Sequence, residues 1–317
     1  MKVVFMGTPD FAVPSLEALA KEGFDILGVI TQPDRPKGRG QKLQPSPVKE
    51  KAVELGLNVY QPNKIRETEF VNFLQGLELD FIVVVAFGQI LPKEILNIPK
   101  YGCINVHASL LPKFRGAAPI HWAVIKGEKE TGVTTMFMDE GLDTGDMLLK
   151  ECISITSQMT TGEVHDKLAQ LGGQLLIKTL NKLQKGQITP EPQNEKEASY
   201  APLLKKEHEK ISWYNTREDI HNLIRGMNSW PGAYTFYKGL RLKIWQSSLE
   251  NVKWDSIAQP GTILAQDNQG FWVQTIDGPL LITQVQPAGR KIMSAKDFFN
   301  GYQVELGQVL GDKDATK

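Results

Sequence analysis

Hydrophobic and polar residues follow one another in the first part of the chain in a pattern typical of a parallel α/β sheet. Uninterrupted apolar runs predict strands that are buried on both faces, at residues 3–6, 26–30 and 81–87. Stretches of mixed polarity predict helices near residues 15–21 and on both sides of a short strand at Val59 and Tyr60. A strand, Gly7 and a helix make a Rossmann-like start, but the dinucleotide fingerprint needs three glycines in register. We therefore expect a Rossmann-like sheet that does not bind NAD.

Two polar side chains interrupt the next predicted strand. Ile104-Asn105-Val106-His107 alternates apolar and polar residues, so Asn105 and His107 project from the same face. An amide and an imidazole side by side suit a developing oxyanion. The alternative is a plain polar strand edge. The loop that follows leaves the carboxyl end of a strand, which is where open α/β sheets place their sites.

An acidic, glycine-rich turn lies close behind in the sequence. Strands are expected near residues 134–138 and 147–155, and the turn between them carries Asp143. Cys103, beside the candidate site, is either a nucleophile or a small buried hydrophobe, and the second is the commoner role of a free cysteine. Cys103 and Cys152 form neither a disulfide framework nor a zinc spacing, and no third metal ligand joins His107 and Asp143. We expect no metal.

The pattern changes in the second half of the chain. Residues 160–163 form a capping box, and an apolar helical stripe then runs to a stop at Gly186. The polar, proline-containing residues that follow read as a linker with nothing to bury. A capped helix beginning near Asn215 and five strand-like runs predict a small OB-type barrel. We expect a catalytic domain at 1–189, a linker at 190–204 and a second domain at 205–317.

The distribution of charge indicates local basic segments rather than a charged chain as a whole. The 317 residues include 36 Lys and Arg against 36 Asp and Glu, which gives no electrostatic case for binding nucleic acid by bulk charge. Prolines and glycines predict a long irregular loop at 33–47. Its basic residues would suit phosphate groups, and the alternative is a loop that is only solvated. In residues 240–244 leucine and isoleucine should face the core, and the basic residues should face outward. The candidate nucleic-acid contacts are Lys37, Arg39, Lys42, Arg241, Lys243, Arg290 and Lys291.

The amino terminus lacks the apolar segment of a signal peptide, and no apolar run approaches transmembrane length. We expect a soluble cytoplasmic protein.

Motifs spanning some forty positions carry a family resemblance. Asn105-Val-His107-Ala-Ser-Leu-Leu-Pro112, then Arg115-Gly116-Ala-Ala-Pro119-Ile, resembles the folate-dependent formyltransferases. So does the stretch from Gly132 to Gly145 with Leu142-Asp143-x-Gly145. The resemblance implies that Asn105, His107 and Asp143 are the catalytic trio. It also implies a folate-binding set made of Phe87, Gly88, Gln89, Ile90, Leu91, Ser109, Leu110, Leu111, Pro112 and Asp139.

Within this family, the loop Asp34-Arg35-Pro36-x-Gly38-Arg39 is similar to a basic insertion that contacts the acceptor end of tRNA, and Arg39 matches its key arginine. The Gly226 to Tyr234 segment is also family-like. The resemblance implies formyl transfer from 10-formyltetrahydrofolate to the amino group of methionyl initiator tRNA, by direct amine attack, in support of translation initiation. Asn105 and protonated His107 would hold the oxyanion while Asp143 orients His107. We expect a monomer.

Three alternatives stay open. A glycinamide-ribonucleotide enzyme would end near the linker, and a sugar-amine enzyme would differ in the loop and in its partner domain. A non-catalytic RNA-binding module would not bind the folate donor. The acceptor assignment therefore rests on the Arg39 loop and on the predicted barrel.

Overall fold

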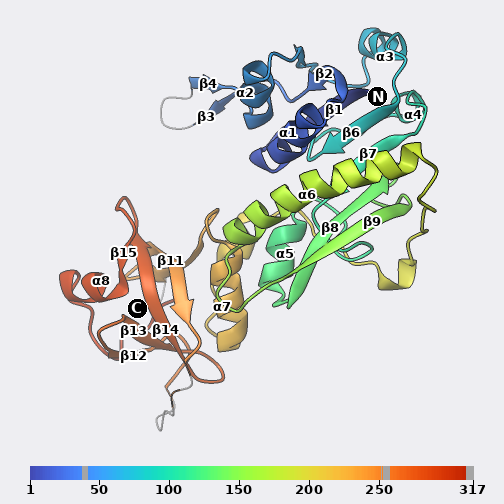
Figure 1. Ribbon diagram of the computed structural model, residues 1–317. Helices are drawn as coiled ribbons and strands as arrows, with labels where there is room; N and C mark the ends of the chain where they lie inside the picture. The colour runs from blue at the N-terminus through green and yellow to red at the C-terminus, as the bar shows by residue number, and fades with distance from the viewer. Residues whose placement is uncertain (38–41, 251, 253–257, 312–317) are drawn as a thin grey trace. The chain divides into compact units, whose positions relative to one another are not determined.

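The computed structural model describes residues 1–37, 42–250, 252 and 258–311. Contacts divide the chain into two compact units (Figure 1). The first comprises Met1–Pro119, Glu130–Ser154 and His165–Pro202, and the second comprises Ile120–Lys129, Ile155–Val164 and Leu203–Lys317. The segment expected to be a linker thus belongs to the first unit as far as Pro202.

The first unit is built on a seven-stranded sheet in the order β5-β2-β1-β6-β7-β8-β9. The first five strands in this order pair in parallel. The last two pairs, β7 with β8 and β8 with β9, are antiparallel. In chain order the strands are β1 (Lys2–Gly7), β2 (Asp25–Ile30), β5 (Val59–Tyr60), β6 (Phe81–Val85), β7 (Cys103–His107), β8 (Glu130–Phe137) and β9 (Met147–Ser154). The Rossmann-like α/β sheet predicted from the apolar runs is confirmed: β6 is buried at every position and β1 at all but its first.

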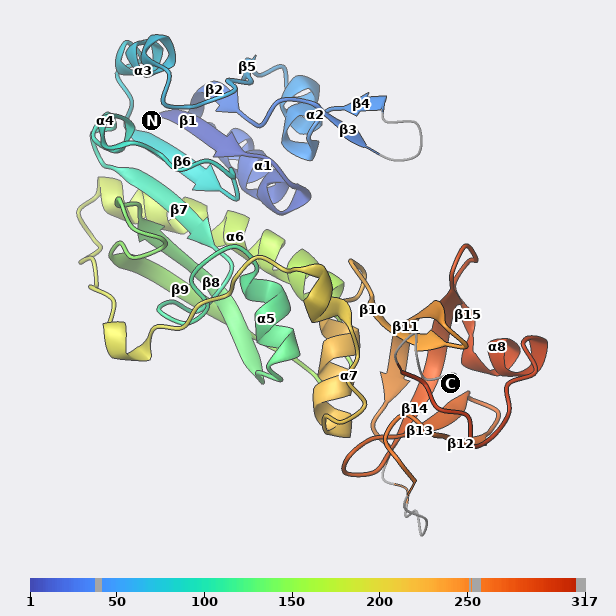
Figure 2. The ribbon, with the colours of Figure 1, turned by 180° about the vertical axis from the view of Figure 1, so that it is seen from behind.

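Helices flank this sheet. They are α1 (Val13–Lys21), which follows a short 3-10 turn at Asp10–Ala12, and α2 (Pro47–Glu54), α3 (Thr68–Gln75), α4 (Lys93–Leu96) and α6 (Thr161–Gln184). Helix α6 crosses one face of the sheet, in front of β8 in Figure 1 and behind it in Figure 2. The predicted capping box is present at its start, because Thr160 N–H donates to Glu163 Oε2 and Glu163 N–H donates to Thr160 Oγ1.

The loop at 33–47 is more regular than expected. Strands β3 (Arg35–Lys37) and β4 (Lys42–Gln44) pair with each other in a small antiparallel ribbon. Pro36 is tolerated there because a two-stranded ribbon has free edges that need no further backbone donor. The prediction that proline and glycine exclude regular structure from this segment was therefore wrong for its two arms.

The second unit holds an antiparallel sheet in the order β10-β11-β14-β13-β12, with β15 paired to β14. Its elements are α5 (Pro119–Ile125), α7 (Arg217–Gly226), β10 (Ala233–Tyr237), β11 (Leu240–Ser248), β12 (Ile263–Gln266), β13 (Phe271–Gln274), β14 (Pro279–Pro287), β15 (Met293–Ser294) and α8 (Ala295–Gly301). Two further 3-10 turns are Glu195–Glu197 in the first unit and Lys206–Glu209 in the second. The five predicted strands are confirmed, and β15 is an additional short one.

The predicted alternation along β11 holds except at its first residue. Leu242 and Ile244 are buried in the core of the unit, whereas Leu240 is 68% exposed. Leu240 directly follows a hairpin turn in which Lys238 and Gly239 both have positive φ, so it lies at the strand end, beyond the core.

Within the described residues no ladder joins β10 directly to β12, so an OB-type barrel is not confirmed. No described helix is long and apolar enough to span a membrane.

Candidate active site

Three polar side chains converge at the carboxyl end of β7. Asn105 lies opposite Met136 and His107 opposite Thr134 in the β7–β8 ladder, and Asp143 comes from the turn between β8 and β9. Asn105 Nδ2 lies 3.4 Å from Asp143 Oδ1, and His107 Nδ1 lies 3.6 Å from Asp143 Oδ2. The backbone N–H of Gly116 donates to Asp143 Oδ2 at 2.8 Å. The strand period and the acidic turn thus bring the three predicted catalytic residues together.

The His107 ring is held on its far side by a backbone carbonyl. Its Nε2 lies 3.0 Å from the carbonyl oxygen of Phe114, which can only accept, so Nε2 carries a proton. Nδ1 is therefore the nitrogen that faces Asp143. The Phe114 carbonyl at the other ring nitrogen is a partner that the sequence did not indicate.

Left-handed backbone occurs at several non-glycine residues, two of which supply partners of His107. Phe114, Asp143 and Ala86 are non-glycine residues with φ of 59°, 55° and 47°. The left-handed region costs free energy for residues with a Cβ, and such residues gather at functional sites. At Phe114 it accompanies a carbonyl aimed at His107, and at Asp143 a carboxylate aimed at the other two members of the trio.

The residues expected to form a linker hold the acidic turn in place. Gln193 Nε2 lies 2.8 Å from the carbonyl oxygens of both Asp143 and Gly145. Arg115 Nε in turn donates to Gln193 Oε1 at 2.9 Å, and its guanidinium makes two bonds to the Glu195 carboxylate at 2.8 and 3.1 Å. Arg115 is fully buried, and the Glu195 carboxylate raises the pKa of its guanidinium. Sequence reasoning missed this support because a polar segment without periodicity looks solvated.

A close backbone approach fixes the same region. Gly116 has φ of 113°, and a Cβ there would lie 2.9 Å from the carbonyl oxygen of Ala201. Only glycine fits both conditions. The sequence offered Arg115 and Gly116 as family motif residues without indicating what they touch.

A cavity of about 390 Å³ lies at the carboxyl ends of β1, β2 and β6. It is lined by Thr8, Gln32, the β3–β4 arms with their prolines, and Ala86 to Gly88. Lys49 Nζ binds both oxygens of Asp34 at 2.7 and 2.9 Å and Gln61 Oε1 at 2.8 Å, and this lowers the pKa of the Asp34 carboxyl. These bonds anchor the start of the inserted loop, a role that the sequence did not indicate.

The predicted folate-binding residues fall into two groups. Side chains of the first group belong to the protein interior: Phe87, Leu91, Leu111 and Ser109 are buried, and Ser109 Oγ donates to Lys113 O at 2.6 Å. The second group is accessible or partly so. Ile90 is 87% exposed, Gly88 has a left-handed backbone, and Leu110 is half-buried.

Polar members of the predicted folate set are held by local bonds. Gln89 Oε1 accepts from Ile65 N–H, and Asp139 accepts from the Thr144 hydroxyl and from Gly141 N–H. The peptide bond between Leu111 and Pro112 is cis.

The predicted nucleic-acid contacts also differ among themselves. Arg39 lies outside the described residues, and Lys37 and Lys42 are described only as backbone partners in the β3–β4 ribbon. Arg241 bonds Glu209 at 2.7 Å and stacks 3.6 Å from the centroid of the Tyr234 ring. Lys243 bonds the carbonyl oxygen of Pro231 at 2.6 Å. Arg290 and Lys291 are exposed in the β14–β15 turn.

Cys103 does not fit a nucleophile. Its side chain is buried, and burial raises the pKa of its thiol to about 12. Among the described residues no group of three or more His, Cys, Asp or Glu could hold a metal ion.

Comparison with known proteins agrees with this geometry. The family model described as formyl transferase matches residues 1–180, and the one described as formyl transferase, C-terminal domain, matches residues 203–303. A methionyl-tRNA formyltransferase of Clostridium perfringens (strain 13 / Type A) is 56% identical over 311 residues, which cover 98% of this chain and 100% of that protein. The methionyl-tRNA formyltransferase of Clostridioides difficile (strain 630) is 52% identical with the same coverage.

A solved structure shows the same fold. The crystal structure of WlaRD, a sugar 3N-formyl transferase in the presence of dTDP and 5-N-formyl-THF, matches with a TM-score of 0.66 and 22% identity, covering 92% of this chain and 99% of that chain. Two formyl transferase family models match this chain, and full-length relatives more than 50% identical to it are methionyl-tRNA formyltransferases. The chain belongs to the methionyl-tRNA formyltransferase family of enzymes.

Proposed function

We propose that this enzyme transfers the formyl group of 10-formyltetrahydrofolate to the amino group of methionyl initiator tRNA, acting as a cytoplasmic monomer in translation initiation. The observation that carries the proposal is the convergence of Asn105, His107 and Asp143 at the carboxyl end of β7, in a chain of this family. The arrangement suits acyl transfer between an amine and a formyl donor.

The chemistry needs no enzyme nucleophile. The amine nitrogen attacks the formyl carbon, and the carbonyl oxygen becomes an oxyanion. The Asn105 amide and the Nδ1–H of protonated His107 donate to that oxygen. The bond between the formyl carbon and the donor nitrogen then breaks; the amine has lost one proton, and the departing nitrogen gains one. Asp143 lies against Nδ1 and the Asn105 amide, so it orients both donors and can pass the proton.

The donor would lie along the two chain segments that flank the trio. Residues 87–91 and 109–112, with Asp139, form the proposed folate site. Ile90 is the natural apolar cover for a flat ring system, because 87% of its surface is exposed and available. Phe87, Leu91 and Leu111 would shape the site from within the core, and Ser109 would do so through its backbone.

The aminoacyl end would enter through the cavity beside the inserted loop. That cavity combines prolines with the polar groups of Thr8, Gln32 and Arg35, and Lys49 anchors its wall through Asp34. Lys37, Arg39 and Lys42 would contact tRNA phosphates from the same loop. We further propose that residues 1–189 form the catalytic domain and 205–317 a tRNA-binding domain. The connecting residues 190–204 would belong functionally to the catalytic domain as far as Pro202, because they pack in the first unit.

We also propose that the second domain works as an OB-type barrel. Residues near the carboxyl end support this: Gly311 N–H donates to Phe236 O on β10, and Leu310 N–H donates to Gly261 O beside β12. This short segment touches both edges of the sheet. Such barrels commonly bind nucleic acid, and Arg241, Lys243, Arg290 and Lys291 would supply its cationic contacts.

A competition among acceptors tests the function. The enzyme and 10-formyltetrahydrofolate are incubated with methionyl initiator tRNA, uncharged tRNA, free methionine, glycinamide ribonucleotide or a dTDP-amino sugar. We expect rapid formylation of the charged tRNA alone. Faster formylation of the sugar or of glycinamide ribonucleotide would replace the proposed acceptor, and failure to bind the donor would favour an RNA-binding module.

The role of the loop has its own test. Arg39→Ala should lower kcat/KM for charged tRNA without changing the Kd of the folate, and added salt should weaken tRNA binding because phosphate contacts release counterions. Unchanged tRNA kinetics would rule out the phosphate contact assigned to this loop.

A further inference from the structure

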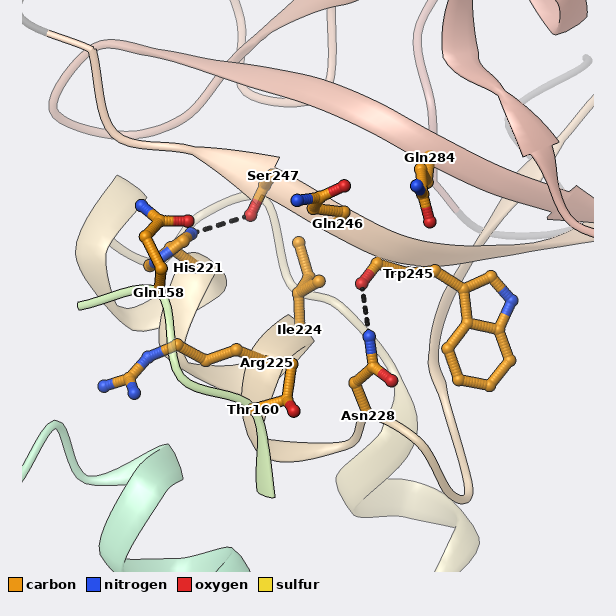
Figure 3. Close-up of a pocket in the computed structure, with 10 residues that line it drawn as sticks. All are labelled: Gln158, Thr160, His221, Ile224, Arg225, Asn228, Trp245, Gln246, Ser247 and Gln284. Atoms are coloured by element: carbon orange, nitrogen blue, oxygen red, sulfur yellow. Dashed lines mark hydrogen bonds between the residues drawn. The ribbon is translucent and has the colours of Figure 1, made fainter. Parts of the chain in front are cut away.

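A second cavity is lined entirely by residues of the second unit, none of which belongs to the trio. It has a volume of about 210 Å³ and is lined by Gln158, Thr160, His221, Ile224, Arg225, Asn228, Trp245, Gln246, Ser247 and Gln284 (Figure 3). These residues come from the segment before α6, from α7 and the turn after it, and from β11 and β14. Nothing in the formyl-transfer chemistry uses them.

The charged and titratable groups of the floor already have partners. His221 Nε2 lies 2.8 Å from the Ser157 carbonyl and Nδ1 lies 2.9 Å from Ser247 Oγ, while burial lowers the pKa of the ring. Arg225 is 6% exposed and donates to the carbonyl oxygens of Thr156 and Met159 and to Asn222. The floor is therefore rigid and offers a ligand no free cation.

The rim of the cavity, unlike its floor, is formed by exposed glutamine side chains. Gln158, Gln246 and Gln284 are all exposed, and the structure records no hydrogen bond for their amides among the residues it describes. In Figure 3 Gln158 lies beside His221 on one side of the cavity, and Gln246 and Gln284 come from the neighbouring strands on the other, with Ile224 below Gln246 and the Trp245 indole at the far side. Three neutral carboxamides around an apolar centre can each donate and accept one or more bonds.

This arrangement selects a class of ligand. A carboxamide pairs with the edge of a nucleobase through one donor and one acceptor, and single-stranded RNA is read by bonding the edges of splayed bases. The volume is below the range of roughly 300–1,000 Å³ that holds a drug-sized molecule, so a single ring system fits and a whole cofactor does not. The absence of a free cation in the floor disfavours a phosphate group.

Cationic and aromatic groups continue from the cavity along β11. Lys243 Nζ lies 5.3 Å from the centroid of the Trp245 ring, and Trp230, in the turn after α7, is 70% exposed. Interleaved aromatic and basic side chains are typical of surfaces that follow an unpaired nucleic-acid strand.

We propose that this cavity binds one unpaired base of the RNA substrate, held at its edge by Gln246 and Gln284, with Lys243 beside the adjoining phosphate. The inference rests on the proposed function for the presence of an RNA substrate. It adds a recognition site that is separate from the trio and from the inserted loop.

The double variant Gln246→Ala/Gln284→Ala tests the proposal against the matched control Gln269→Ala, which removes an exposed amide from the turn between β12 and β13. We expect kcat/KM for charged tRNA to fall by about tenfold or more in the double variant, through KM, because a bidentate amide–base pair discriminates on that scale. The Kd of 10-formyltetrahydrofolate and the kcat at saturating tRNA should not change, and the control should match the wild type.

A second measurement identifies the base. Charged tRNAs that each carry one abasic unpaired nucleotide are compared; one of them should lose affinity for the wild type and lose nothing further with the double variant. Unchanged tRNA kinetics, or a loss that no abasic position reproduces, overturns the proposal, as does saturable binding of free nucleosides that leaves tRNA kinetics untouched. If the wild type formylates no tRNA, the proposed function fails first, and direct binding of uncharged tRNA to both proteins still decides whether the cavity holds a base.

Discussion

The side chain of His107 is held in one orientation by its neighbours in the candidate site. The Phe114 carbonyl occupies Nε2, and Asp143 stands at Nδ1. The hydrogen bond from Nε2 fixes the plane of this buried imidazole, and Nδ1, 3.6 Å from the carboxylate, keeps its side of the ring available. The backbone of Phe114 and Asp143 takes left-handed φ values to provide these partners. The orientation of His107 thus depends on two neighbours whose backbone adopts the left-handed conformation.

Cys103 supplies a sharp prediction at the same scale. Burial raises the pKa of its thiol to about 12, so at pH 8 only about one molecule in 10⁴ carries the reactive thiolate. A thiol-reactive dye should therefore modify Cys152, which is exposed, and leave Cys103 untouched until the protein unfolds. The expected titration is one thiol in the native protein and two in denaturant. Modification of both thiols in the native protein at equal rates, or inactive but folded Cys103→Ala, would return Cys103 to the list of nucleophiles.

Sequence reasoning found the members of the trio but not their supports. Asn105 and His107 share a face because side chains in a strand alternate with a period of two residues, and the alternation of residues 104–107 is enough to predict this. Gln193 and Arg115 act on the same turn from positions 78 residues apart in the chain. No local pattern encodes such a contact, because the hydrogen bonds form only after the segment folds back onto the sheet.

At the scale of elements, the segment that follows α6 is part of the site rather than a tether. Residues up to Pro202 pack in the first unit, and Ala201 is fully buried. Arg115 N–H donates to Ser199 O, and Ala201 N–H donates to Arg115 O. The sequence predicted a linker here, because the segment is polar and contains prolines. Backbone bonds, which side-chain polarity does not reveal, hold it instead.

Arg115→Ala should release this segment. The loss removes the charge-assisted bonds to Glu195 and Gln193, and we expect a destabilisation of about 2 kcal/mol, limited by the exposure of Glu195 to solvent. Limited proteolysis followed by mass spectrometry should find no cleavage between residues 190 and 202 in the wild type and new cleavage there in the variant. Arg217→Ala, on α7, serves as a control for loss of an arginine. Equal cleavage of wild type and Arg115→Ala would contradict the anchoring role.

The predicted elements themselves were largely correct where hydrophobic periodicity was strong. Strands β1, β6 and β10 to β14 follow from apolar runs or alternation, because burial of one or both faces imposes those patterns. Leu240 and the β3–β4 ribbon were misjudged, because a strand end and an exposed ribbon bury too little surface to impose a pattern.

At the scale of the whole molecule, stability should depend on pH through the second unit. In the folded protein, burial lowers the pKa of His221 below its ordinary value of 6.5. As the pH falls, the unfolded chain therefore protonates this imidazole more readily than the folded protein does. The corresponding stability is fully present above about pH 6.5 and is lost as the pH falls below it. Between pH 7.5 and 5.5 the Tm of the wild type should fall more steeply than that of His221→Gln, measured by thermal unfolding. Parallel pH dependences would show that His221 does not contribute.

The most direct test of the whole account is the single-turnover rate of formyl transfer from 10-formyltetrahydrofolate to methionyl initiator tRNA. Asn105→Ala and His107→Ala should each lower that rate by about 10²–10³-fold, the usual cost of losing one oxyanion donor, and Asp143→Ala should lower it at least as far. Donor and tRNA affinities should stay near those of the wild type, and His165→Ala, at a half-buried histidine on α6, should transfer at the normal rate. A His107→Ala enzyme that binds both substrates and transfers the formyl group at the wild-type rate would contradict the mechanism.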